Sequence, residues 1–370
     1  MEMINLMHTE WSKGWGGQEI RILGESIALS KKGLNVFIAC QPDSLLFKRC
    51  LESGIKCLPI KLNKGLNLIA LFRIVSFIVR NKINIIHTHS SVDSRVGGIA
   101  AKICRIPVVR SRHISEPVKK RFFTWFQYMV IADAVITSGS YIRKMLITNN
   151  KMKPSRIISI PAGVDANLYL KKQTSQEPNI IDELNLHGKF VIGMVSVLRS
   201  WKGHNYAIKA VNKLIQTSTS FHLLIVGDGP KRKEIETLIK KLNLNKHVTL
   251  VGHVDNPIPY YRAMNIVLLP SYAGEATSQT LPQAMILGVP VITTGIGGLP
   301  EVVEHEKTGL VVEPRDFQQI HDAIFRMYSD NRLYRKFSLA GKKKVLKKFT
   351  YEKMVEDTYS VYKNLLKDIQ

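Results

Sequence analysis

Two polar side chains, separated by seven residues, draw attention to one segment of the C-terminal half. The segment reads GEATSQTLPQAM and runs from Gly274 to Met285, with Glu275 first, then small hydroxyl residues, then Gln283 at the start of an apolar run. A carboxylate accepts hydrogen bonds, whereas a carboxamide both accepts and donates them. The segment therefore places two hydrogen-bonding groups around a helix start, and their ligand depends on what surrounds them.

Two cations follow an apolar strand pattern in the segment SVLRSWKGH, where Arg199 and Lys202 are three residues apart. Cations at the C-terminal end of a strand can hold a diphosphate and disperse the charge of a leaving group. A pair of solvated surface cations would have the same sequence, and charge alone leaves both interpretations open.

Glycine-rich loops between a strand and a helix occur at KGWGG, residues 13–17, and at GIGGLPEVV, residues 295–303. Such loops present backbone N–H groups at a helix N-terminus, which suits a phosphate, although a tight turn needs glycine too. Pro300 fits the first turn of a helix. The first loop reads GxGG and the next strand ends in CQP without an acid, which argues against a nicotinamide-binding site.

Three histidines lie at or just past predicted strands. His113 follows VVRSR and is either a surface residue, which is the simpler interpretation, or a site residue that hydrogen-bonds a substrate. His87 and His89 form an HxH pattern, which points both rings to one face of a strand. A metal site would need a third ligand and a nearby acid, which the spacing does not supply. We therefore expect these side chains to face or support a substrate, and we expect no metal.

Short apolar strands alternate with helical patterns along the whole chain, which indicates βαβ units and parallel sheets. The first half has strand patterns at residues 3–8, 35–40, 84–89, 107–113, 134–139 and 157–163, and the second half at 190–198, 221–230, 247–254, 265–271, 290–298 and 308–314. A polar stretch within 161–188 separates the halves. These patterns predict an α/β fold of two Rossmann-like, doubly wound domains that face a cleft, with ligands at the C-terminal strand ends.

The length and the composition of the chain limit the class of protein to which it can belong. The 370 residues favour two domains, and 45% hydrophobic residues favour a globular chain. No secretory signal is recognisable, the longest apolar stretch is interrupted by Arg73, and the four cysteines form no CxxC pair. We therefore expect a cytoplasmic protein with free thiols.

The net charge of +24 favours an anionic partner: nucleic acid, anionic lipid or a phosphorylated substrate. The segment KKRFFTWFQYMV, residues 119–130, joins three cations to an aromatic run, which is typical of a helix at a membrane interface and also of a core helix with a basic start. No nucleic-acid-binding module is recognisable. We expect the protein at the inner face of the cell membrane, with no nucleic acid as partner.

Taken together, GEATSQTLPQAMILGVPVITTGIGGLPEVV, GGQE, VVRSRH, LRSWKGH and LLIVGDGP resemble the retaining nucleotide-sugar glycosyltransferases of family four, which have the GT-B fold. The resemblance spans nearly the whole chain and is specific to the superfamily, not to one donor or acceptor. It implies an acceptor-binding N-terminal domain, residues 1–168 with 351–370 crossing back, and a donor-binding C-terminal domain, residues 169–350.

The resemblance also implies roles for single residues. His113, Arg199, Lys202 and Glu275 match catalytic positions: a histidine beside the transferred sugar, the cation pair on the donor diphosphate, and the first acid of the E-x7-E motif, which contacts sugar hydroxyls. The matching donor-binding positions are Gly16, Gly17, Gly227, Thr280, Leu281, Gln283, Gly297 and Gly298.

Two departures from the family pattern concern the nucleotide. Gln283 replaces the second acid, which contacts the ribose, and Ser278 replaces a glycine that is usual in this turn. A carboxylate can accept from both ribose hydroxyls, whereas glutamine accepts with its oxygen and donates with its nitrogen. We therefore expect a weaker or rearranged ribose contact.

The implied reaction moves a hexose or N-acetylhexosamine to an acceptor hydroxyl with retention, without a cofactor and without a metal, since no DxD-like acid pair is present. We expect a UDP-sugar as donor and a membrane-associated envelope glycan as acceptor, such as lipopolysaccharide, O-antigen or capsule. The alternatives are another enzyme with this fold, such as a nucleotide-sugar epimerase or a phosphorylase, or a non-catalytic protein that binds polyanions or membranes.

Overall fold

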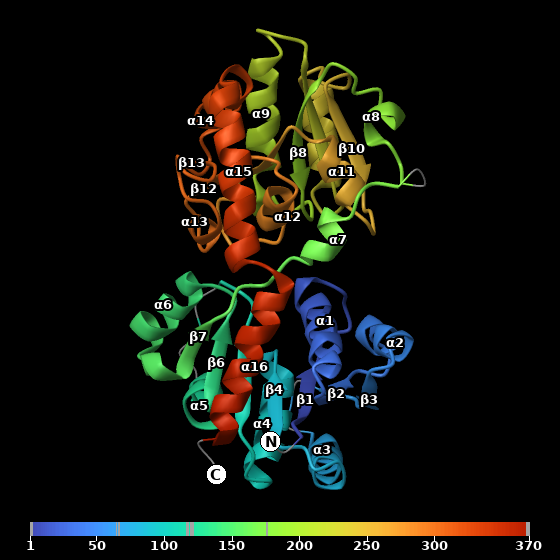
Figure 1. Ribbon diagram of the computed structural model, residues 1–370, viewed down its shortest axis with the longest axis vertical. Helices are drawn as coiled ribbons and strands as arrows, with labels where there is room; N and C mark the ends of the chain where they lie inside the picture. The colour runs from blue at the N-terminus through green and yellow to red at the C-terminus, as the bar shows by residue number, and fades with distance from the viewer. Residues whose placement is uncertain are drawn as a thin grey trace. The chain divides into compact units, whose positions relative to one another are not determined.

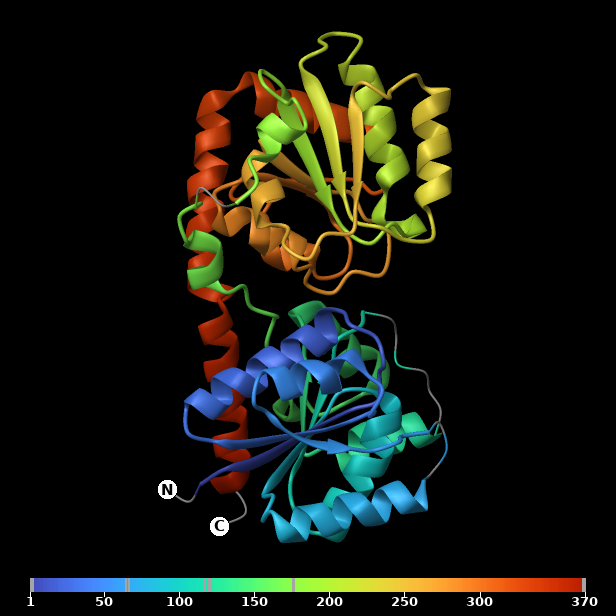
Figure 2. The same ribbon diagram turned by 90° about the vertical axis from the view of Figure 1, so that its right-hand side faces the viewer.

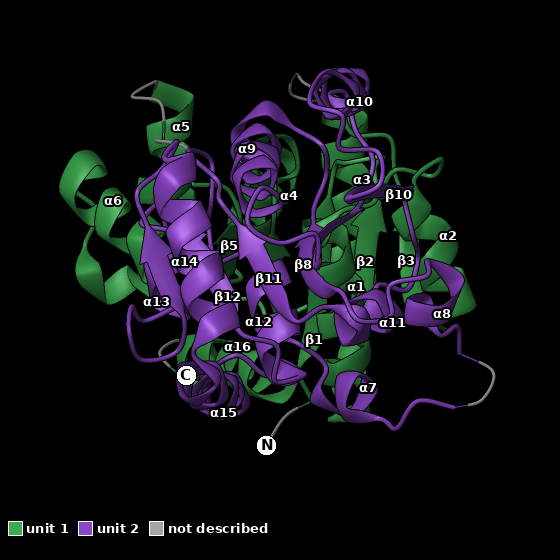
Figure 3. Ribbon diagram, turned by 90° about the horizontal axis from the view of Figure 1, so that it is seen from above, with its two compact units in different colours: residues 1–162, 352–370 green, residues 163–351 purple. Residues whose placement is uncertain are grey.

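The computed structural model describes residues 3–367, except for 64, 66, 116–117, 119–121 and 175–176. The chain divides into two compact units (Figures 1 and 3). Unit 1 comprises Met1–Ala162 and Glu352–Gln370, and unit 2 comprises Gly163–Tyr351. The first division therefore lies a few residues before the boundary inferred at 168, and residues 352–370 are part of unit 1.

Unit 1 contains a parallel sheet of seven strands in the order β3-β2-β1-β4-β5-β6-β7. Its strands are β1 (Asn5–Glu10), β2 (Asn35–Cys40), β3 (Lys56–Pro59), β4 (Ile85–Thr88), β5 (Val108–Arg112), β6 (Ala134–Thr137) and β7 (Ile157–Ser159). The strand order reverses between β1 and β4, and sheets of this kind bind ligands beyond the carboxyl ends of the strands at such a point.

Helices cover both faces of this sheet (Figure 2). They are α1 (Gly17–Lys31), α2 (Leu45–Glu52), α3 (Leu68–Arg80), α4 (Ser91–Ile103), α5 (Phe122–Phe126), the π-helical η1 (Gln127–Ile131), α6 (Ser140–Asn150) and α16 (Tyr351–Lys367), with a 3-10 turn η2 (Pro154–Arg156). One apolar core lies between the sheet and α3, α4 and η1, and a smaller one lies beneath α1 and α2. Burying both faces suits parallel strands, which are apolar along their whole length.

Unit 2 repeats this plan with six parallel strands in the order β10-β9-β8-β11-β12-β13. They are β8 (Phe190–Val195), β9 (Phe221–Val226), β10 (Val248–Gly252), β11 (Ile266–Leu269), β12 (Val291–Thr294) and β13 (Leu310–Val312). The order reverses between β8 and β11, and extensive apolar cores lie on both faces of the sheet.

The helical elements of unit 2 precede, connect and follow these strands along the chain. They are α7 (Ala166–Leu170), α8 (Ile180–Glu183), the 3-10 turn η3 (Ser200–Lys202), α9 (His204–Leu214), α10 (Arg232–Lys241), α11 (Ile258–Ala263), α12 (Thr280–Ile286), α13 (Leu299–Val302), α14 (Phe317–Ser329) and α15 (Asn331–Lys348). Both units are thus doubly wound α/β domains, which confirms the predicted fold class. Among the described residues, no helix has the length and hydrophobicity needed to cross a bilayer.

Candidate active site

A partly buried ion pair of unit 2 joins two predicted site residues. Glu275, which is 5% exposed, accepts hydrogen bonds on Oε1 from Lys202 Nζ at 2.6 Å and from Ser271 Oγ at 2.6 Å. Lys202 follows β8 and Ser271 follows β11, the two strands between which the strand order reverses. The sheet topology therefore explains why residues about 70 positions apart in the chain meet at a ligand-binding edge.

Arg199 lies in the same loop as Lys202 but is exposed, and its guanidinium sits 5.1 Å from the centre of the Trp201 ring. The loop then turns at Gly203, whose φ of +79° and close approach to the Pro270 backbone exclude other residues. This turn places the two cations at the C-terminal edge of the sheet, with Arg199 exposed and Lys202 in a partly buried ion pair.

We predicted from the resemblance that several glycines bind the donor. Three of them lie against backbone atoms of other loops. Gly297 has φ +59°, and a Cβ there would collide with the carbonyl oxygen of Glu275. The amide of Gly298 donates to the same oxygen at 3.3 Å, and the amide of Gly227 donates to Gly252 O at 2.8 Å. In this structure, therefore, these glycines let the loops approach closely and hold the Glu275 loop. The backbone N–H groups of Gly298 and Gly227 already donate to carbonyl oxygens of the protein.

The segment around α12 is tied to the neighbouring strand. Thr280 Oγ1 donates to Val195 O at 2.7 Å, at the end of β8, and the side chain of Leu281 is fully buried. Ser278 Oγ accepts from the amide of Thr280 at 3.3 Å, so this departure from the family pattern engages an amide of the turn. Only the backbone of Leu281 is thus available to a ligand.

The second departure also has a partner in the structure. Gln283 Oε1 accepts a hydrogen bond from the hydroxyl of buried Tyr261 at 3.0 Å. The carboxamide oxygen keeps a second lone pair and the side-chain NH2 carries two N–H donors. Gln283 therefore offers a ligand a donor that an acid in its place would lack.

In unit 1, the predicted glycine loop leads directly into α1. The amide of Gly16 donates to Glu19 Oε2 at 2.8 Å, so Glu19 caps the helix in a capping-box arrangement. A Cβ on Gly17 would meet nothing within 4 Å. Gly16 therefore does not offer a free amide in this structure, and the open space lies at Gly17.

His113 is the last member of a chain of hydrogen-bonded histidines at the C-terminal edge of this sheet. His8 Nδ1 lies 2.9 Å from His89 Nε2, and His89 Nδ1 lies 3.2 Å from His113 Nε2. His113 Nδ1 then lies 3.4 Å from Ser138 Oγ. His113 is half-buried, which makes the interpretation as a surface histidine wrong.

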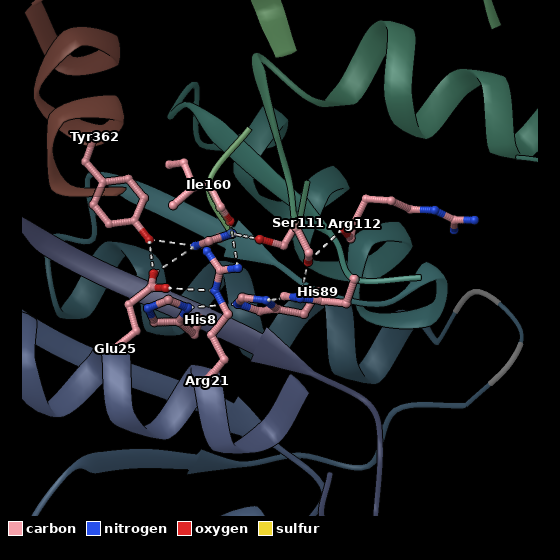
Figure 4. A network of polar contacts seen from close by, with 11 residues as sticks. His8, Arg21, Glu25, His89, Ser111, Arg112, Ile160 and Tyr362 are labelled. Carbon is pink, nitrogen blue, oxygen red and sulfur yellow. Dashed lines mark hydrogen bonds and ion pairs between the residues drawn. The ribbon is translucent and has the colours of Figure 1, made fainter. Parts of the chain in front are cut away.

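A second branch of buried polar groups lies beside this chain (Figure 4). His87 contacts the Tyr362 hydroxyl of α16 through Nδ1 at 2.6 Å and Ser111 Oγ through Nε2 at 2.8 Å. The Tyr362 hydroxyl donates to Glu25 at 3.2 Å, and Arg21 Nε contacts the other oxygen of Glu25 at 3.5 Å. This branch fastens the last helix to unit 1.

Burial controls the charge of these groups. Burial, and then the nearby Arg21 guanidinium, lower the pKa of His8 and of His113 to about 3. Burial and the neighbouring histidines lower the pKa of His87 and His89 well below its usual value. All four rings are consequently neutral at pH 7, and each carries a single N–H.

Glu10, at the end of β1, is a buried acid at the same edge of the sheet. Burial and then the charge of Asp93 raise its pKa to about 8, although the amide of Ser12 and the side chain of Gln18 donate to it and oppose the shift. The ionised form of this acid is unfavourable in its surroundings, which is why its pKa is raised. Strongly shifted pKa values are common at functional sites.

His8, His87 and His89 have ligand atoms within 4.8 Å of one another, close enough for three metal ligands. The third ligand that sequence spacing did not supply comes from β1, because the parallel register pairs His8 with His87. Two facts weigh against a cation at this place: hydrogen bonds already occupy the nitrogens of His87 and His89, and the charge of Arg21 acts on all three rings.

Several site residues escaped the sequence analysis, among them Ser271, Tyr261, His8 and Glu10. One signal was present: the dipeptide His-Thr ends two strand patterns, MHTE and IHTH. This repeated dipeptide could be interpreted only from the structure, which shows that β1 and β4 are adjacent strands and pair His8 with His87.

Comparison with known proteins agrees with the two-unit fold. Residues 15–168 match the model of "Glycosyltransferase Family 4", and residues 176–344 match that of "Glycosyl transferases group 1". The structure resembles a glycosyltransferase from Rickettsia africae, with a TM-score of 0.91 at 21% identity over 99% of this chain and all of the other. It also resembles the HepE protein of Anabaena in complex with UDP, with a TM-score of 0.86 at 20% identity over 98% of this chain and all of the other.

Two curated relatives are similar over most of their length. The capsular polysaccharide biosynthesis glycosyltransferase CapM of Staphylococcus aureus is 25% identical over 93% of this chain and 94% of its own. N-acetyl-alpha-D-glucosaminyl L-malate synthase of Bacillus anthracis is 27% identical over 78% of this chain and 77% of its own. With both units matched, the chain belongs to the family 4 glycosyltransferases of the GT-B fold.

Proposed function

We propose that the protein transfers a hexose or N-acetylhexosamine from a nucleoside diphosphate sugar to an acceptor hydroxyl with retention of the anomeric configuration. The observation that carries this proposal is the contact of Lys202 with Glu275, with Arg199 in the same loop. A cation pair suits the donor diphosphate, and a carboxylate suits the hydroxyls of its sugar.

In the proposed step, the bond from the anomeric carbon to the diphosphate oxygen breaks while the bond to the acceptor oxygen forms on the same face. The acceptor's proton passes to an oxygen of the departing phosphate. Arg199 and Lys202 stabilise the negative charge of the leaving group, which is the role a metal ion plays elsewhere. Glu275 is engaged by Lys202 and Ser271 on one oxygen, which suits a hydrogen-bond acceptor better than a nucleophile.

We propose UDP as the nucleotide. The support is the overall likeness to HepE, whose structure holds UDP. The loop near residues 252–256, which follows β10 at the same edge of the sheet, is the place where we expect the base. The NH2 group of Gln283 would then donate to a ribose hydroxyl oxygen, while its carboxamide oxygen accepts from Tyr261.

For the acceptor we propose an envelope glycan at an anionic membrane surface, as the relationship to CapM suggests. In unit 1, the α5 side chains of Phe122, Phe123 and Trp125 are 69%, 65% and 50% exposed. Their cationic neighbours at 119–121 lie outside the described residues. Exposed aromatic side chains on a protein of net charge +24 suit the boundary between lipid headgroups and acyl chains.

Helix α3 offers a second apolar surface in the same unit. Leu68, Ile69 and Phe72 are exposed on it, and its sequence contains no acidic residue. Helix α3 packs against α4, and α4 packs against η1, which continues α5. We propose that α3 and α5 contact the same membrane.

A smaller acceptor is the second candidate, because the Bacillus anthracis relative is named for a product of L-malate. The net charge of +24 is compatible with a small anionic acceptor as well. The exposed aromatic residues of α5 favour the glycolipid, since a small soluble acceptor would leave them without a partner.

The reaction is tested by incubating the protein with UDP-sugars and candidate acceptors, followed by NMR of the product. Retention predicts the same anomeric configuration in donor and product, and release of UDP only when acceptor is present. An inverted product would contradict the proposed chemistry. Donor conversion without acceptor would instead indicate an epimerase or a hydrolase, and binding of polyanions without any donor binding would indicate a non-catalytic protein.

A further inference from the structure

We propose that His8 and His89 are positioning residues that hold His113 in the tautomer with its proton on Nδ1, so that His113 offers an N–H donor. The effect of this tautomer on catalysis rests on the proposed function. The tautomer itself is a property of the protein without substrate. The argument uses the hydrogen-bonded chain His8–His89–His113–Ser138 of unit 1.

Each contact between two rings requires one proton. Because the three rings are neutral, each has one N–H and one nitrogen with a free lone pair. If His89 donates from Nδ1 to His113, its Nε2 must accept from His8 Nδ1. The His113 proton then lies on Nδ1, facing Ser138 Oγ.

In the opposite arrangement, all three protons are on Nε2. His89 then donates to His8 Nδ1, and His113 Nε2 donates to His89. The three tautomers therefore change together, and the whole chain has only two fully hydrogen-bonded states. What distinguishes these states is the far end of the chain, at His8 Nε2.

His8 Nε2 is buried and has no hydrogen-bond partner in the part of the chain that the structure describes. In the first state this nitrogen carries a lone pair, and in the second it carries a buried, unsatisfied N–H. A buried N–H without a partner is rarer in folded proteins than a buried lone pair without one, so the unpartnered His8 Nε2 favours the first state. At the other end of the chain, Ser138 Oγ donates to Arg112 O at 3.2 Å and therefore faces His113 Nδ1 as an acceptor, which favours the same state.

The selected state gives His113 a donor at Nδ1 at the C-terminal edge of the unit 1 sheet. Ser138 Oγ, at 3.4 Å, is a weak acceptor for it, so a ligand oxygen could take this hydrogen bond at small cost. A sugar hydroxyl or carbonyl oxygen is the chemical class that fits. His113 would touch the substrate, whereas His8 and His89 act through it.

The experiment is two-bond 1H–15N correlation NMR of the protein labelled with 15N-histidine, without substrate, with the His113 signals assigned from their loss in His113→Gln. We expect the pattern of a neutral Nδ1–H imidazole for wild-type His113. His89→Leu should give a mixture of tautomers or the Nε2–H form. His89→Asn should restore the Nδ1–H pattern, since the asparagine NH2 can replace the Nδ1 donor.

His87→Leu is the matched control, because His87 lies two residues before His89 in the chain with its ring centre 4.2 Å from that of His89, yet it contacts Tyr362 and Ser111. It should leave the His113 tautomer unchanged. In transfer assays, His89→Leu should lower kcat by about tenfold, the size expected for one lost hydrogen bond, with KM for the donor little changed, and His89→Asn should recover most of the loss.

An Nε2–H pattern for wild-type His113 would overturn the proposal, and this result does not depend on any variant folding. A stoichiometric transition metal in the purified protein that His8→Leu abolishes would overturn it too. If wild type has the Nδ1–H tautomer but no sugar is transferred, the proposed function fails while the tautomer assignment stands.

Discussion

At the scale of single residues, Glu275 is the centre of the site in unit 2, because one of its oxygens receives hydrogen bonds from both Lys202 and Ser271. We predict that Lys202→Met lowers kcat for sugar transfer by about a hundredfold, since it removes a cation that meets developing charge. Ser271→Ala should cost only about tenfold, because Lys202 remains to orient the carboxylate.

The matched control is Lys209→Met, which makes the same change at an exposed position on α9 of the same unit. Steady-state rates of the three variants check this prediction. Equal losses in the Lys202 and Lys209 variants would mean that net charge alone matters and would remove Lys202 from the site.

Glu10 gives a prediction about pH. Burial raises its pKa from 4.5 to about 8, so the folded protein holds this proton more tightly than the unfolded chain does. Stability from this group is therefore fully present below pH 4.5 and is lost as the pH rises toward 8. Glu10→Gln, which mimics the protonated acid, should be more stable than wild type at pH 8 and nearly equal to it at pH 5.

Urea unfolding of both proteins across this pH range measures the difference. The comparison reports Glu10 together with Asp93, the buried acid whose charge acts on it, because the other buried groups titrate in both proteins. Gln18 can rotate its carboxamide to face either the acid or the amide at position 10. A difference in unfolding free energy that grows toward low pH would show that the pKa of Glu10 is not raised.

At the scale of elements, the site depends on how closely the loops after β8, β11 and β12 approach one another. Gly297 has φ +59° and lies against the backbone of Glu275, where no side chain fits. Gly297→Ala should therefore destabilise the protein by about 2 kcal/mol or more and should displace the carboxylate.

Gly17→Ala is the control, since a Cβ at that position meets nothing within 4 Å and the residue already lies in α1. It should leave the midpoint of thermal unfolding unchanged or raise it, because alanine favours a helix. Calorimetry of both variants tests this, and equal effects would contradict the role given to the loop contact.

Element order was largely predictable from the sequence, because buried parallel strands form short apolar runs bounded by turn residues and alternate with longer helical patterns. Strand β3 escaped because Lys56–Pro59 is short and half-exposed at the sheet edge. The positions of Glu275 and Lys202 followed from motif spacing. The hydrogen bonds that engage the amides of Gly16 and Gly298 did not, because they depend on loop geometry that only the folded chain defines.

At the scale of the whole molecule, net charge and exposed aromatic residues together predict membrane binding. The protein should sediment with anionic vesicles at low salt and leave them at high salt, since salt screens charges farther apart than about 10 Å at 0.1 M. Phe122→Ala with Trp125→Ala should lower the bound fraction at low salt by removing apolar contact.

Phe325→Ala with Leu339→Ala is the control, since both residues are exposed on the helices α14 and α15 of unit 2. That variant should sediment like wild type. Equal binding by all three proteins would assign the interaction to charge alone and would remove α5 from the proposed membrane surface.

The nucleotide-sugar site of unit 2 is the centre of this account, and a thermal-shift measurement with UDP, GDP, ADP and their sugar conjugates tests it most directly. A ligand that binds only the folded protein raises its melting temperature. The account predicts a clear rise with one nucleotide family, UDP first. That rise should be lost in Arg199→Ala and Glu275→Ala and kept in Lys209→Ala. No rise with any nucleotide, or an equal rise in Arg199→Ala and wild type, would contradict it.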